Sequence, residues 1–151
     1  MDKLQFLKTE FPKLLQTLKP DAKGNWGVMN GIQMVEHMTY SVHFATGTLG
    51  TKIMTPAERL DASRSFAMSD KEFKPNTKNT MMSETPEPAK NATMQEAIKE
   101  FENELTAFLS YFEINKGATL TNPFFGELNF EEWIHLFYKH AQHHCKQFGL
   151  V

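Results

Sequence analysis

The sequence predicts an all-α protein, a four-helix bundle in which a long loop crosses between the second and third main helices. Apolar residues recur at intervals of three and four over several long stretches, and the alternating pattern of strands is nearly absent. The chain has 151 residues, which suits one compact domain, and we expect residues 1–151 to form a single helical-bundle domain. Nine Met and thirteen Phe supply side chains that fill irregular helical cores well.

The sequence predicts three helices in the first half of the chain, of which the first two are long. Residues 4–18 carry an apolar stripe, and Pro12 within it is expected to kink that helix or divide it into two. The second helix is expected from Gly31 to Leu49, with Asn30 as its N-cap and Gly50 as its stop.

A short helix and a long loop follow. Thr55 is expected to cap the short helix, with Pro56 in its first turn and its end near Phe66. Residues 69–91 carry only weak helix and strand signals. They predict a long loop, either a cover over a pocket or a solvent-exposed connection.

The second half predicts two longer helices. Thr93 caps the first, Glu96 completes a capping box, and the helix runs to about Glu113. Residues 117–129 are expected to form a loop. Asn129 then caps the last helix, which has acidic residues in its first turn.

Composition narrows the classes of partner. The net charge of −2 gives no electrostatic reason to expect nucleic acid or a membrane surface as a partner, and no apolar run could span a bilayer. The single cysteine, Cys145, excludes an internal disulfide, and the polar N-terminus does not resemble a signal peptide. We therefore expect a cytoplasmic protein whose partner is a small molecule, with dimerisation through a bundle face as an open option.

Histidines of the last helix form the main functional signal. His140 and His144 are four residues apart, so their side chains share one helical face. Trp133 and His144 fall roughly 20° and 40° from His140 on a helical wheel, inside the apolar arc. His143 falls at the edge of that arc and His135 outside it.

The second helix adds a third histidine. His37 falls inside the apolar arc of that helix, whereas His43 faces solvent. Three imidazoles with an open fourth position are the ligand set of a catalytic divalent-metal site. The alternative is a metal-free cluster of core histidines joined by hydrogen bonds. A His-Glu-x-x-His protease helix is excluded, because position 141 is Ala.

Three stretches together resemble the DinB/YfiT-like superfamily of four-helix metalloproteins, most closely a bacterial branch of it. They are Trp26-Gly27-Val28-Met29-Asn30 with Gln33-Met34-Val35-Glu36-His37, then Asn122-Pro123-Phe124-Phe125-Gly126-Glu127-Leu128, and last Glu132-Trp133 with Tyr138-Lys139-His140, His144 and Gln147-Phe148-Gly149. The resemblance implies a divalent metal, commonly nickel or zinc, bound by His37, His140 and His144. Where the superfamily often reads His-Arg-Gly-Gln, this chain reads His144-Cys145-Lys146-Gln147.

Four polar residues are candidates for orienting a ligand imidazole or lining a substrate pocket: Gln33, Ser41, Asn122 and Gln147. For the two glutamines, ordinary polar positions at the helix edges are the alternative. Cys145 falls away from the ligand face and is expected to be a packing residue.

Two enzyme chemistries fit this site. Metal-activated water could hydrolyse an ester, amide or thioester, or a metal-bound thiol could react as a thiolate in a transferase. Relatives implied by the resemblance include both thiol-dependent transferases and hydrolases. The alternative function is that of a non-catalytic, stress-related bundle that binds a metal or a small molecule.

Overall fold

The computed structural model describes residues 2–46, 52–75 and 85–151. Nine helices and strands follow one another along the described chain: α1 (Lys3–Gln5), the π-helix η1 (Phe6–Glu10), α2 (Phe11–Gln16), α3 (Gly31–Thr46), α4 (Ala57–Met68), α5 (Met94–Ile114), β1 (Leu120–Asn122), β2 (Gly126–Leu128) and α6 (Phe130–Gln147).

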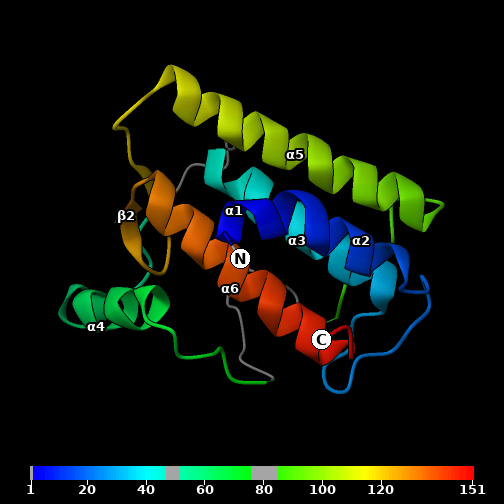
Figure 1. The fold of residues 1–151 in the computed structure, drawn as a ribbon. Helices are drawn as coiled ribbons and strands as arrows, with labels where there is room; N and C mark the ends of the chain where they lie inside the picture. The colour runs from blue at the N-terminus through cyan, green and yellow to red at the C-terminus, as the bar shows by residue number, and fades with distance from the viewer. Residues whose placement is uncertain (1, 47–51, 76–84) are drawn as a thin grey trace.

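Four helical units form the bundle: the run from α1 to α2, then α3, α5 and α6. Figure 1 shows α5 along the upper side and α6 running diagonally towards the C-terminus, with α1 and α2 between them. The most extensive packing is between α3 and α5, while α4 lies apart and packs on α6. The predicted all-α bundle is confirmed, and α4 belongs to the long connection between α3 and α5.

Large aromatic side chains fill the core. The largest side chains that are almost completely shielded from solvent include Phe11, Phe101, Phe108 and Trp133. Phe108 lies at the centre of a ring cluster, with its centroid 5.0 Å from that of Phe137 and 6.4 Å from that of Trp133. Because rings of this size dominate core energetics, they hold α5 against α6.

The first helical run changes helix type next to Pro12 and does not break there. It occupies the second position of α2, directly after the π-helix Phe6–Glu10, and the Phe11 N–H bonds back to the Phe6 carbonyl. Since proline lacks an N–H and crowds the carbonyl four residues earlier, a wider turn accommodates it. The chain remains helical from Lys3 to Gln16.

The predicted N-caps of the longer helices are correct. The Asn30 Oδ1 accepts from Gln33 N at 2.9 Å, the Thr93 hydroxyl from Glu96 N, and the Asn129 Oδ1 from Glu132 N at 2.9 Å. One detail differs, because the Glu96 carboxylate accepts from Ala92 N and not from the cap residue. The predicted end of the second helix, Leu49 with Gly50, lies outside the described residues.

Two expectations for the connecting segments are wrong. Thr55 does not cap α4, which begins at Ala57 after Pro56 without a side-chain cap. The Thr55 hydroxyl instead donates to the Phe124 carbonyl at 2.8 Å, so a tertiary contact has replaced the local one. The segment 117–129 is also not simply a loop, because β1 and β2 pair within it as an antiparallel hairpin.

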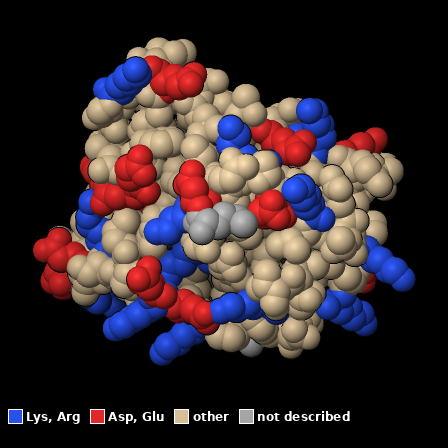
Figure 2. Space-filling view, viewed as in Figure 1, with Lys and Arg blue, Asp and Glu red and all other residues tan. Residues whose placement is uncertain are grey.

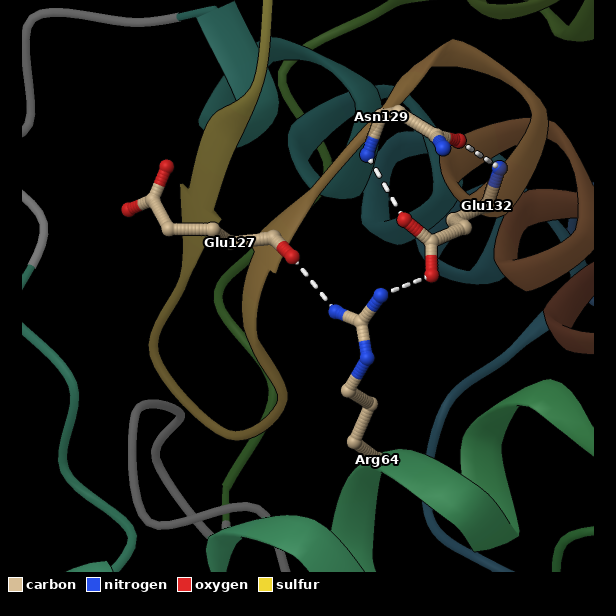
Figure 3. A network of polar contacts seen from close by, with 4 residues as sticks. All are labelled: Arg64, Glu127, Asn129 and Glu132. Atoms are coloured by element: carbon tan, nitrogen blue, oxygen red, sulfur yellow. Dashed lines mark hydrogen bonds and ion pairs between the residues drawn. The ribbon is translucent and has the colours of Figure 1, made fainter.

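Arg64 of α4 joins the hairpin to the start of α6. Its guanidinium donates to the Glu127 carbonyl and to the Glu132 carboxylate, as Figure 3 shows. Glu132 and Asn129 also bond to each other reciprocally as a capping box. This network fixes the N-terminal end of the helix that carries two of the candidate ligands.

The surface matches the near-neutral composition. On the face shown in Figure 2, Lys and Arg are interspersed with Asp and Glu, and neither sign gathers into a broad patch. Among the described residues, no helix combines the length and apolar character needed to cross a bilayer.

Candidate metal centre

Two helices of the bundle bring three histidines together. His37 comes from α3, and His140 and His144 come from consecutive turns of α6. The Nε2 of His140 lies 2.9 Å from the Nε2 of His37 and 2.8 Å from the Nε2 of His144. The three residues that the sequence predicts as ligands thus point one nitrogen each at a common centre.

Burial makes all three imidazoles neutral. It lowers the pKa of His37 to about 4, with a smaller contribution from His143. It lowers the pKa of His144 to about 3, and it holds the pKa of His140 well below the usual range, where both other rings add to the effect. At neutral pH the centre therefore offers uncharged nitrogen donors, the form in which histidine binds metals.

This donor set fits a divalent ion. Imidazole nitrogen suits zinc and nickel. A tetrahedral zinc site with Zn–N bonds of roughly 2.0–2.1 Å separates its ligand nitrogens by roughly 3.3 Å. The contacts of 2.8 and 2.9 Å would need to open by about half an ångström, a small shift for three side chains.

Gln147 contacts the three-histidine cluster directly. Its Oε1 lies 2.7 Å from the Nδ1 of His144, and its Nε2 donates to the Trp26 carbonyl at 2.8 Å. The buried Nδ1 of His37, by contrast, has no hydrogen-bond partner among the described residues. The two outer imidazoles are thus supported differently.

The other polar candidates have identifiable local partners. Gln33 forms a reciprocal cap with Asn30 and donates through Nε2 to the Glu87 carbonyl at 2.9 Å. The Ser41 hydroxyl donates to the His37 carbonyl at 2.9 Å, which places it one turn along the same face. Asn122 lies in the hairpin, where its Oδ1 accepts from Phe124 N and Phe125 N as an Asx turn.

The remaining histidines lie outside this cluster. His43 is exposed and pairs with Glu104, while His135 bonds to Lys3 and to the Ser69 carbonyl. His143 lies against the cluster, its ring centroid 5.1 Å from that of His144. Cys145 is fully buried, and burial raises the pKa of its thiol to about 12, so it is a packing residue.

Two residues near the centre were not predicted from the sequence. Phe73 sets the edge of its ring against His140 and His143, with centroids 6.4 and 6.1 Å apart. Lys139 holds the segment that carries Phe73, because its ammonium donates to the Phe66 and Ser69 carbonyls at 2.7 and 3.2 Å. Phe73 lies in a segment without periodic signal, so no sequence pattern could have assigned it.

Both described ends of the predicted loop 69–91 are tied to the helices that carry the three histidines. Ser69 binds α6 through Lys139, the neighbour of His140. At the other end, the carboxylate of Glu36, the neighbour of His37, accepts from Lys90 N and Asn91 N. The predicted loop 69–91 thus flanks the centre through the residues that the structure describes.

Comparison with known proteins agrees with this architecture. A family model for the DinB superfamily matches residues 4–148. The comparisons with curated proteins and with solved structures gave no match. The match spans the bundle from its first helix to the end of α6 and includes all three histidines, so the chain belongs to the DinB superfamily.

Proposed function

We propose that this protein binds one divalent metal ion, nickel or zinc, through His37, His140 and His144 and uses it in an enzymatic reaction on a small molecule. The observation that supports the proposal is the convergence of three Nε2 atoms, each on a neutral imidazole, at 2.8 and 2.9 Å. A protein-only hydrogen-bond network serves this arrangement poorly. The central Nε2 of His140 carries either one proton or one lone pair, and it faces two partners.

The three residues hold the ion without neutralising its charge. When bound, the ion would supply Lewis-acid activation of a water molecule or of a thiol substrate. The chain supplies the position of the donors, since α3 and α6 are fixed by capped N-termini and by the aromatic core. Within the described residues, the cluster of candidate ligands contains histidine alone and no carboxylate. A three-histidine set leaves further coordination positions for reactants.

The residues around the centre favour a partly apolar small molecule. Phe73 lies against His140, and the Trp26 ring lies against His143, with the Trp26 and His143 centroids 5.5 Å apart. Cys145 is excluded as a nucleophile by its burial and by its pKa of about 12. Any thiol in the reaction would therefore come from a substrate or a second small molecule, not from the protein.

Metal analysis tests the binding step. Protein purified without a His tag should contain about one equivalent of metal, and His37→Ala and His140→Ala should each abolish it. His43→Ala is the matched control, because His43 lies on the same helix as His37 but is exposed and pairs with Glu104. A wild-type protein that takes up no stoichiometric nickel or zinc would contradict the proposal.

An activity screen then separates the chemistries. Esters and thioesters are offered to the metal-loaded protein with and without low-molecular-weight thiols. Turnover without thiol identifies a hydrolase, and turnover that needs thiol identifies a transferase. Stoichiometric metal without turnover in either arm would favour the non-catalytic, metal-carrying bundle and would contradict the enzymatic part of the proposal.

A further inference from the structure

We propose that the backbone carbonyl of Trp26, acting through the Gln147 amide, fixes His144 as the Nδ1–H tautomer and so directs its Nε2 lone pair towards the metal. This inference rests on the proposed metal site and assigns it a positioning residue, Gln147. It also assigns a role to the loop 24–27, although Trp26 and Gln147 are 121 positions apart in the chain.

The orientation of the Gln147 amide follows from its partner. A backbone carbonyl only accepts hydrogen bonds, so the atom that lies 2.8 Å from the Trp26 oxygen must be the NH₂ group of Gln147. The amide oxygen then faces the Nδ1 of His144 at 2.7 Å. Because that oxygen is also only an acceptor, the Nδ1 must carry the proton.

The position of that proton determines whether the Nε2 of His144 has a free lone pair for a metal ion. A neutral imidazole has one N–H and one lone pair, and the neutral form is the one that binds metals. With the proton on Nδ1, the Nε2 that faces the His140 Nε2 at 2.8 Å has a free lone pair. Without Gln147, the proton could move to Nε2 and donate to His140, which would close a hydrogen-bonded pair that competes with the metal.

The loop 24–27 is shaped for this contact. A Cβ on Gly27 would lie 2.7 Å from the Nε2 of Gln147, and a Cβ on Gly24 would lie 2.9 Å from its Cγ. Gly27 also has a φ of +79°, which favours glycine. The loop is tied to the end of α6 by its backbone, because Asn25 N donates to the Gln147 carbonyl at 2.7 Å. The amide of Gln147 is consequently enclosed and only 3% exposed.

Substitution of Gln147 tests the relay through metal affinity. Affinity for Zn²⁺ or Ni²⁺ is measured by competition with a chromophoric chelator. Gln147→Leu should weaken binding by roughly 10- to 100-fold, the usual effect of removing the partner of a ligating histidine. Gln147→Glu, which keeps an acceptor oxygen, should bind more tightly than Gln147→Leu. The control is Gln142→Leu on the same helix, which should retain wild-type affinity.

Substitution of the loop tests the same relay without altering α6. Gly27→Ala should weaken metal binding, because its methyl group must displace the Gln147 amide. Gly117→Ala is the matched control, since Gly117 has a φ of +80° and a Cβ there would meet nothing within 4 Å. Both variants introduce the same backbone strain, so only the Gly27 variant should lose affinity for the metal.

The tautomer itself gives a readout that a purely structural role would not change. In metal-free protein, ¹⁵N-resolved NMR of the imidazoles should show His144 as Nδ1–H, and Gln147→Leu should shift the proton to Nε2. The relay is overturned if Gln147→Leu keeps both the Nδ1–H tautomer and wild-type metal affinity, or if wild-type His144 is Nε2–H. If the wild type binds no metal, the proposed function fails, while the NMR measurement still decides the relay.

Discussion

Acid should destabilise the metal-free protein well before its carboxylates titrate, because the three clustered histidines are desolvated and neutral in the folded state. The pKa of His37 is lowered to about 4 and that of His144 to about 3, from 6.5 in each case, and the pKa of His140 is also held well below its usual range. Because the pKa is lower in the folded state, at pH values below 6.5 the unfolded chain binds protons that the folded chain does not bind. The stability is therefore complete above pH 6.5 and is lost as the pH falls below it.

The size of the effect follows from these values. At pH 5 an unfolded histidine is almost fully protonated, while the rings of His37 and His144 are still mostly neutral. Each of these two rings then contributes a loss of about 2 kcal/mol, and His140 acts in the same direction. The loss is a large fraction of the free energy of unfolding of a typical domain, roughly 5–15 kcal/mol. The limiting slope is about 4 kcal/mol per pH unit, set by three protons.

Urea unfolding in the presence of a chelator, at pH values from 7.5 to 5, measures this slope. His37→Gln should reduce it by about one third, because one proton no longer binds on unfolding. His43→Gln leaves the cluster intact and should keep the steep dependence. A free energy of unfolding that stays constant between pH 6.5 and 5, or a slope unchanged by His37→Gln, would refute the argument that these rings are buried and neutral.

Three further predictions concern stability. Metal at a concentration 100 times Kd should raise the unfolding free energy of the wild type by about 2.7 kcal/mol, as measured by calorimetry. It should not stabilise His37→Ala. Equal stabilisation of both proteins would contradict binding at the three histidines. Asn129→Ala should lower stability by about 1 kcal/mol in urea unfolding, since it removes the cap of α6, and an unchanged midpoint would count against that cap. Lys139→Met should lower stability by about 2 kcal/mol, because the carbonyls of Phe66 and Ser69 lose a charged donor, and a stabilised variant would show that burying the ammonium outweighs its hydrogen bonds.

The helices and the clustering of the three histidines could be predicted because both depend on local periodicity. A core-facing residue recurs with the helical repeat, so a wheel places His37, His140 and His144 on apolar faces before any contact is known. Two such faces in one small bundle must meet at the core. The caps Asn30 and Asn129 are similarly local, since each satisfies N–H groups within its own first turn.

The connecting segments were predicted less well because their contacts are tertiary. The hairpin strands are three residues each, too short to show alternation, and their pairing depends on the Asx turn at Asn122. Thr55 has the residue type of an N-cap, but its hydroxyl bonds to a carbonyl of the hairpin. A capping preference of about 1 kcal/mol is easily outweighed by such a contact.

The helical pattern of the sequence could not predict which of the two glutamines, Gln33 or Gln147, bonds to a histidine of the cluster. Gln33 lies one turn before His37, yet it is also three residues after an N-cap, and the structure uses it to close that cap. Gln147 lies close to His140 on the helical wheel but bonds to His144. What separates the two is a backbone carbonyl at Trp26, which no side-chain pattern encodes. Periodicity can select which imidazoles meet, but the tautomer of His144 depends in our proposal on the distant loop 24–27, and so a substitution at Gly27 should act on the three-histidine cluster.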